Sequence, residues 1–159
     1  MKRINIICVD DERHVLESLT SELSFFSDLF HIEQCESALE CLRLLEDLSH
    51  QEKLVALVIA DDLMPGKTGV ELLSEIETDN RFIGTKKLLL TSMIAQEDVI
   101  KAVGQARLDD FLEKISVPDE LLQTVKELVT QYVVEKGLEF ENYTEKLDTK
   151  ILARLPLIH

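Results

Sequence analysis

The chain has 159 residues, of which 45% are hydrophobic and 30% charged, and its formal net charge is −14. This length allows one domain with a real core, and 31 acidic against 17 basic residues argue against direct nucleic-acid binding. No apolar run reaches the length of a membrane span, and Asp10-Asp11-Glu12 interrupts the first apolar run too early for a signal peptide. We therefore expect a cytoplasmic protein with no membrane segment.

Short apolar runs predict five β-strands along the chain. The first two runs are Ile4 to Val9 and Phe30 to Cys35, and the third, Leu54 to Ala60, is the most continuous. Shorter runs at Leu88 to Leu90 and Asp110 to Leu112 complete the set. A continuous apolar run is typical of a central parallel strand covered on both faces. We expect the third strand at the centre and the second and fifth strands at or near the edges.

Segments with apolar residues at helical spacing separate these runs. Five helices are expected: from Val15 to Phe26, from the capping-box pattern Ser37–Glu40 onward, from Gly69 to Glu77, from about Ala95 to Gly104, and from Ser116–Asp119 to about Lys136. Strand–helix alternation of this kind predicts an α/β fold, a doubly wound parallel sheet with right-handed crossovers and helices on both faces.

Polar residues capable of phosphoryl chemistry follow four of the expected strands. Asp10 and Asp11 follow the first strand, Asp61 the third, Thr91 the fourth and Lys114 the fifth. Because ligands bind at the carboxyl ends of strands in such sheets, we expect these side chains to converge on one cleft. Three carboxylates, a hydroxyl and an ammonium suit a hard cation and a phosphoryl group, with Asp61 as the nucleophile.

A divalent cation is expected in that cleft on electrostatic grounds. Neighbouring carboxylates raise one another's pKa, so three of them need a positive charge to remain ionised together. Mg²⁺ prefers oxygen ligands and keeps several waters. The three cysteines, Cys8, Cys35 and Cys41, show no CxxC spacing, and we interpret them as small buried hydrophobic residues.

Residues 3–133 resemble the receiver domain of two-component response regulators. The motifs that carry this resemblance are Val9-Asp10-Asp11-Glu12, Asp61-Asp62-Leu63-Met64-Pro65-Gly66 with Gly69, Thr91-Ser92, and Phe111-Leu112 before Lys114. The resemblance implies a flavodoxin-like five-stranded sheet of strand order 2-1-3-4-5. It also implies a function, namely acceptance of a phosphoryl group from a histidine kinase in His-to-Asp signal transduction.

The resemblance assigns a metal site and a phosphoacceptor. Asp61, four residues before Pro65, is the expected phosphoacceptor. Asp62 is the alternative acceptor, and the spacing to the proline argues against it. Asp11, Asp61 and the backbone carbonyl of Leu63 are the implied direct Mg²⁺ ligands, and Asp10 acts through water.

The resemblance also assigns a switch. Lys114 is expected to pair with a phosphoryl oxygen, and Thr91 to move toward the phosphate once it forms. Phe111, three residues before Lys114, is the expected switch aromatic. Its rotation would change the surface of the fourth helix, fifth strand and fifth helix, where a partner binds. Plain core packing is the alternative for Phe111.

Two features depart from the family pattern. Ile115 stands where the family usually has a proline after the lysine, so the conformation of the Lys114-Ile115 bond is left open. Arg107-Leu108 replaces the small Gly-Ala pair common before the fifth strand, which makes that loop bulkier.

Residues 1–133 are expected to form the receiver domain, and residues 134–159 a helical extension or linker. The apolar ending at Leu157-Ile158 favours a chain cut from a longer protein, or a tail docked on a partner protomer. The stripe Tyr143, Leu147 and Ile151 should be buried, either on the fifth helix of the same chain or in a homodimer through that helix and the extension.

The expected partners are a sensor histidine kinase or phosphotransfer protein, and a downstream protein or fused output domain. On this interpretation the protein is not an enzyme beyond its own phosphorylation and dephosphorylation. The first alternative is a Mg²⁺-dependent phosphatase of the haloacid dehalogenase type. Such enzymes need a second acid two residues after the nucleophile, where this chain has Leu63. The second alternative is a structural adaptor that is never phosphorylated.

Overall fold

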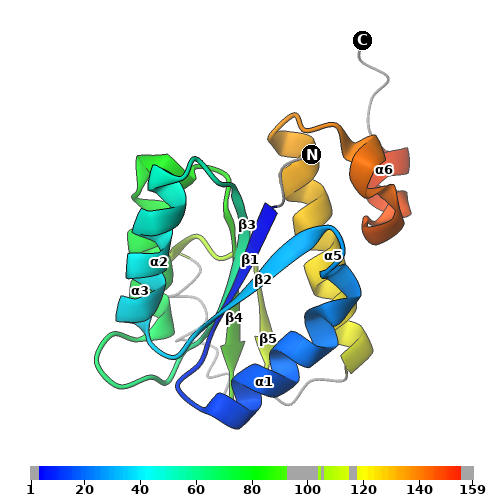
Figure 1. Ribbon diagram of the computed structural model, residues 1–159. Helices are drawn as coiled ribbons and strands as arrows, with labels where there is room; N and C mark the ends of the chain where they lie inside the picture. The colour runs from blue at the N-terminus through cyan, green and yellow to red at the C-terminus, as the bar shows by residue number, and fades with distance from the viewer. Residues whose placement is uncertain (1–3, 93–103, 105, 115–117, 155–159) are drawn as a thin grey trace.

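The sheet has five parallel strands in the order β2-β1-β3-β4-β5. The computed structural model describes residues 4–92, 104, 106–114 and 118–154. The strands are β1 Ile4–Val9, β2 Phe30–Cys35, β3 Val55–Asp61, β4 Lys86–Thr91 and β5 Asp110–Glu113 (Figure 1). Every residue of β3 is buried, whereas β2 and β5 contain partly exposed residues. The predicted α/β fold, the strand order, the central third strand and the two edge strands are confirmed.

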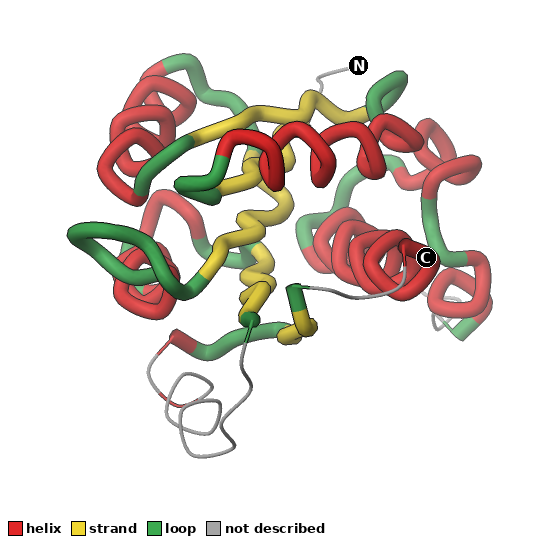
Figure 2. The backbone as a smooth tube through the Cα atoms, turned by 90° about the horizontal axis from the view of Figure 1, so that it is seen from below, coloured by secondary structure: helices red, strands yellow, loops and turns green. Residues whose placement is uncertain are grey.

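Helices cover both faces of this sheet, as Figure 2 shows. They are α1 Arg13–Glu22, α2 Ala38–His50, α3 Gly69–Glu77, α5 Pro118–Glu135 and α6 Thr149–Ala153, with 3₁₀ turns η1 Leu23–Phe26, η2 Asn80–Phe82 and η3 Phe140–Lys146. The predicted fourth helix, Ala95 to Gly104, lies almost wholly outside the described residues. No helix in the described part of the chain combines the length and the apolar character that a membrane span requires.

Two hydrophobic clusters form the core, one on each face of the sheet. Helices α1 and α5 pack on one face, through residues such as Leu16, Val125 and Val129. Helices α2 and α3 pack on the other, through Cys41, Leu45 and Leu72, in a cluster that also contains Cys35 of β2.

The three cysteines are free and buried, as the sequence predicted. Burial raises the pKa of the Cys8 thiol well above its ordinary value, so the thiol stays neutral and serves as packing.

Helix starts follow local chemistry. The Ser37 side chain accepts a hydrogen bond from the Glu40 backbone N–H, which confirms the predicted start of α2. The Glu40 carboxylate accepts from the N–H of Glu36 at 3.0 Å. A complete capping box that the sequence analysis missed, between Thr68 and Glu71, starts α3. The predicted single helix from Val15 to Phe26 instead tightens into a 3₁₀ turn after Glu22, a common ending for an α-helix.

The C-terminal segment packs on its own chain. Tyr143 and Leu147 are 5% and 1% exposed and belong to the α1–α5 cluster. The Tyr143 ring lies 5.6 Å from the ring of Phe30 at the start of β2. Asp148 begins α6 and accepts a hydrogen bond from the side chain of Gln123 on α5 at 2.8 Å. The predicted burial is confirmed for Tyr143 and Leu147, within the chain, while Ile151 is only half-buried.

Candidate functional site

Four strand ends meet at one edge of the sheet and carry the predicted polar residues. Asp10 directly follows β1, Asp61 is the last residue of β3, Thr91 is the last residue of β4, and Lys114 directly follows β5. Because all strands are parallel, their carboxyl ends lie at the same edge. Local sequence therefore places each group, and the sheet order brings them together.

Three carboxylates gather at this edge. One oxygen each from Asp10, Asp11 and Asp61 lie within 4.8 Å of one another. Asp10 and Asp61 are 1% and 3% exposed, whereas Asp11 is exposed. The backbone N–H of Glu12 donates to Asp10 Oδ1 at 2.8 Å and fixes the orientation of that carboxylate. The cluster thus offers hard oxygen donors of the kind that Mg²⁺ prefers.

Lys114 supplies the positive charge among these carboxylates. Its Nζ lies 3.1 Å from Asp61 Oδ2, 3.2 Å from Asp10 Oδ2 and 3.2 Å from Glu12 Oε1. Its backbone N–H donates to the carbonyl of Thr91 at 2.8 Å, which ties the end of β5 to the end of β4. The ammonium is therefore held over Asp61, where it can meet a group bound to that carboxylate.

Charge and burial shift the pKa values of this pair. Burial raises the pKa of the Asp61 carboxyl, and Asp10 and Asp11 raise it further, while Lys114 opposes the rise. Burial alone would lower the pKa of the Lys114 ammonium, but its hydrogen bonds to carboxylates prevail and the pKa lies above the ordinary value. The one ammonium of Lys114 does not outweigh burial and the two neighbouring carboxylates, and a divalent cation on the three carboxylates would supply further positive charge.

Gly69 lets the loop after β3 close tightly on Asp61. A Cβ atom at Gly69 would lie 2.3 Å from the backbone oxygen of Asp61 and 2.9 Å from its carbonyl carbon. The Gly69 N–H also donates to the carbonyl of Asp62 at 3.0 Å. Glycine is therefore required for steric reasons, because any side chain would push against the backbone of Asp61.

A cavity of about 450 Å³ opens beside the carboxylates. Asp61, Lys114 and Glu12 form its polar end, and Val15, Leu19 and Leu121 line its apolar part between α1 and α5. Leu63 also lines it and is 65% exposed. A substrate group can thus reach Asp61 from solvent.

The two residues predicted to form the switch, Thr91 and Phe111, lie on neighbouring strands. Thr91 is buried at the end of β4, and Phe111 on β5 is half-buried against the α2–α3 cluster. The Lys114-Ile115 bond lies outside the described residues, as does most of the predicted fourth helix. Sequence patterns alone assigned no role in the site to Glu12 or Gly69. The acidic run Asp10-Asp11-Glu12 and the glycine so soon after Asp61 were the available signals.

Comparisons with known proteins agree on one family. The family model described as "Response regulator receiver domain" matches residues 6–126. Response regulator Rre1 of Synechocystis sp. is 34% identical over 128 residues, which cover 80% of this chain and 52% of that protein. The hydrogenase transcriptional regulatory protein HoxA of Cupriavidus necator is 28% identical over 157 residues, 99% of this chain and 29% of its own length. The chain thus spans about half or less of these two curated relatives.

Solved structures show the same fold. The receiver domain of an HD domain-containing protein from Pseudomonas fluorescens Pf-5 superposes with a TM-score of 0.74 at 24% identity, covering 86% of this chain and 94% of that one. A CheY-like receiver domain protein from Methanospirillum hungatei JF-1 gives a TM-score of 0.71 at 25% identity, covering 84% of this chain and 99% of that one.

Proposed function

Because the chain belongs to the response regulator receiver family, we propose that Asp61 is its phosphoacceptor in two-component signal transduction. The observation that carries this assignment is the position of Asp61: it is buried, it lies within 4.8 Å of two further carboxylates, and its Oδ2 lies 3.1 Å from Lys114 Nζ. The proposed nucleophile and the ammonium thus line one cavity, beside the proposed cation site.

The proposed reaction transfers a phosphoryl group from a phosphohistidine. A carboxylate oxygen of Asp61 forms a bond to phosphorus in line with the breaking N–P bond, and the imidazole leaves with the electron pair and takes up a proton. The product is an acyl phosphate on Asp61. Such transfers depend on positioning and charge neutralisation, and Lys114 provides both to one phosphoryl oxygen.

The donor set fits Mg²⁺. Asp11, Asp61 and the backbone carbonyl of Leu63 would hold the ion directly, and Asp10 would hold it through water. When bound, Mg²⁺ supplies positive charge to the carboxylates and the incoming phosphoryl oxygens.

The proposed output is a local switch. Thr91 and Phe111 lie on adjacent strands, β4 and β5, where Leu89 pairs with Phe111 and Thr91 with Glu113. Movement of Thr91 toward the phosphate would free space for Phe111 to turn inward and would change the surface around β5 and α5. One added charge then biases a two-state element.

The proposed partners follow from the family. A sensor histidine kinase or phosphotransfer protein would donate the phosphoryl group, in the cytoplasm, and a downstream protein or fused output domain would respond. The relative HoxA is named as a transcriptional regulatory protein, and this name supports a downstream response to the signal. A homodimer through α5 and the C-terminal segment remains part of the proposal. Tyr143 and Leu147 are already buried within the chain, so the outer surface of that segment would make the contact.

The alternative functions are not favoured. A haloacid dehalogenase-type phosphatase needs an acid at position 63, where Leu63 is 65% exposed and nonpolar. A structural adaptor gives no reason for Lys114 to contact three carboxylates. Accordingly, we propose that the protein turns over no external substrate.

Beryllofluoride binding tests the proposal without chemistry. In the presence of Mg²⁺, this phosphoryl mimic should shift the backbone amide resonances near Asp61, Thr91 and Lys114. Asp61→Asn should abolish the shifts, and Asp62→Asn, at the neighbouring acid, should leave them intact. Shifts that persist in Asp61→Asn would refute the assignment of the acceptor.

A further inference from the structure

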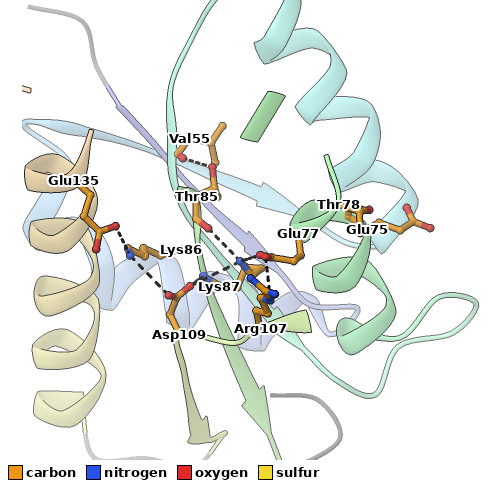
Figure 3. Close-up of polar contacts among 10 residues, drawn as sticks. All are labelled: Val55, Glu75, Glu77, Thr78, Thr85, Lys86, Lys87, Arg107, Asp109 and Glu135. Carbon is orange, nitrogen blue, oxygen red and sulfur yellow. Dashed lines mark hydrogen bonds and ion pairs between the residues drawn. The ribbon is translucent and has the colours of Figure 1, made fainter. Parts of the chain in front are cut away.

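Two buried lysines lie at the amino end of β4, at the opposite end of the sheet from Asp61. Lys86 and Lys87 are 8% and 5% exposed. As consecutive strand residues they point to opposite faces of the sheet. Figure 3 shows each ammonium among carboxylates from other elements. A buried lysine without a partner lowers the stability of the fold, so the carboxylates that pair with these two lysines stabilise the structure.

Each lysine reaches a helix on its own face. Lys86 Nζ lies 2.7 Å from Glu135 Oε2 at the end of α5, and Lys87 Nζ lies 2.6 Å from Glu77 Oε2 at the end of α3. Both lysines share one further carboxylate, that of Asp109, at 3.8 and 4.0 Å. Asp109 therefore connects the ion pairs on one face of the sheet with those on the other.

Asp109 also makes a two-way backbone contact with Lys87. The Lys87 N–H donates to Asp109 Oδ2 at 2.8 Å. The Asp109 N–H donates to the Lys87 carbonyl at 3.0 Å. The pair lies immediately before the first β4–β5 partners, Leu88 and Asp110. Asp109 thus fixes the point at which β5 begins to pair with β4.

The register of β5 matters because the strand is short and lies at the sheet's edge. It has four residues, from Asp110 to Glu113, and among the described strands it pairs only with β4. A slip of one residue would turn every β5 side chain to the other face and shift the strand by about 3.3 Å. Phe111 would leave its cluster, and Lys114 Nζ would lose its 3.1 Å contact with Asp61.

We propose that Asp109 is a positioning residue for phosphoryl transfer, which holds β5 in register and thereby holds Lys114 over Asp61. The proposal rests on the function proposed above. Asp109 touches none of the reacting groups and acts through the strand. Its side chain has two separable properties, an acceptor for the Lys87 N–H and a charge for the two lysines.

Two substitutions separate these properties. Asp109→Asn keeps an oxygen that can accept from Lys87 N–H but removes the charge, and Asp109→Ala removes both. Glu135→Gln is the matched control, because it removes a carboxylate from Lys86 without touching the β5 backbone. Phosphorylation by acetyl phosphate gives the rate, magnesium titration the metal affinity, and amide hydrogen exchange the pairing of β5.

Asp109→Ala should slow phosphorylation about tenfold or more, the order expected when one charge-assisted hydrogen bond is lost. Asp109→Asn and Glu135→Gln should stay within about twofold of the wild-type rate while both melt at lower temperature. Magnesium affinity should not fall in any of the three, because Asp10 and Asp11 follow β1 and Asp61 is the last residue of β3. Amides of β5 should lose exchange protection in Asp109→Ala only.

A wild-type rate in folded Asp109→Ala, or a loss of magnesium affinity that parallels its loss of rate, would overturn the proposal. If Asp109→Ala does not fold, Asp109→Leu takes its place, with a side chain of similar shape that has neither acceptor nor charge, and the same expectations. If the wild-type chain takes no phosphate at Asp61, the proposed function fails. In that case, wild-type exchange protection of β5 in Asp109→Ala would separately refute the register claim.

Discussion

At the scale of single residues, the reactive role proposed for Asp61 comes with a cost to the stability of the fold. Burial raises the pKa of its carboxyl, helped by Asp10 and Asp11 and opposed by Lys114. A raised pKa in the folded state means that the protonated acid fits the fold better than the carboxylate does. The associated stability is present below the unfolded pKa and is lost as the pH rises through the folded pKa.

Asp61→Asn should therefore stabilise the metal-free protein at neutral pH. We expect a rise in melting temperature of about 2–4 °C, the shift that corresponds to roughly 1 kcal/mol in a chain of this size. The gain should shrink as the pH falls below the ordinary carboxyl range of about 4, where Asp61 is protonated in both states. Thermal melts from pH 3 to pH 7 test this, and a neutral-pH melting temperature below that of the wild type would contradict it.

Gly69→Ala should damage the site through the backbone. The added methyl would lie 2.3 Å from the Asp61 carbonyl oxygen, so either the loop or β3 must move. We expect a loss of about 2 kcal/mol or more in unfolding free energy, as for other overpacked sites, together with slower phosphorylation.

Gly104→Ala is the control for that substitution, since its new methyl would have no neighbour within 4 Å. Denaturant unfolding of both variants gives the comparison. Equal stability of the two would show that the loop can yield at no cost.

Arg107→Gly should stabilise the protein. Arg107 has a φ of 48°, in the left-handed region that glycine adopts without strain. Its ion pair with Glu77, at 3.8 Å, is largely exposed and contributes little. We expect a gain of about 0.5–1 kcal/mol, the relieved strain less the entropy that glycine loses on folding.

Arg107→Ala serves as the control, because it removes the ion pair but keeps the strained backbone. It should be no more stable than the wild type. A Gly variant no more stable than the Ala variant would indicate that the loop stores no strain.

At the scale of elements, the sequence predicted the strands better than the ion pairs that hold them in place. The continuous run in β3 predicted its central place, and the groups at the strand ends predicted the cleft. The apolar run that predicted the fourth strand is Leu88 to Leu90, and β4 contains this run but begins two residues earlier, at Lys86. In the sequence, two adjacent lysines look like part of a solvated surface. Their partners Glu77, Asp109 and Glu135 lie elsewhere in the chain, so the sequence does not show that the lysines are paired. Contacts of that kind leave no local periodicity to detect.

The limits of sequence patterns differ from site to site. The sequence has Arg107 where the family usually has glycine. The structure shows the physical consequence, which is a non-glycine residue with a positive φ of 48°. The contact between Glu12 and Lys114 joins residues 102 apart and could not be inferred from spacing. The α1 ending could not be predicted either, since apolar spacing continues from the α-helix through the 3₁₀ turn.

The C-terminal segment should contribute to the stability of the receiver. Tyr143 is 5% exposed and packs on Phe30, so Tyr143→Ala should cost about 3 kcal/mol, in the range for buried aromatic side chains. Ile151→Ala, at a half-buried position of the same stripe, should cost less than half as much. Equal costs in denaturant unfolding would argue against stable packing of η3 on the core.

The oligomeric state is a separate question about the same element. If α5 and the C-terminal segment form a homodimer, light scattering should give a dimer mass for the full chain and a monomer mass for a version ending at Gly137. Monomers in both, with and without phosphate, would exclude the dimer and leave intramolecular packing as the segment's role.

At the scale of the whole molecule, the proposed reactive groups lie at the carboxyl end of the sheet. The residues proposed to hold the strands in position lie at the amino end. Asp10, Asp61, Thr91 and Lys114 lie at the carboxyl ends of the strands, and Lys86, Lys87 and Asp109 lie at the amino ends of β4 and β5. Parallel topology produces this division, because all five strands begin at one end of the sheet and finish at the other. A receiver can then change at one end while the other holds the sheet in register.

The most direct test of the account is the mass of the intact protein after incubation with acetyl phosphate and Mg²⁺. We predict the addition of one hydroxylamine-labile phosphoryl group, its loss in Asp61→Asn, and its retention in Asp62→Asn. Removal of Mg²⁺ with a chelator should also prevent it. Undiminished labelling of Asp61→Asn, or no labelling of the wild type under conditions in which Mg²⁺ binds, would contradict the assignment of Asp61 as the phosphoacceptor.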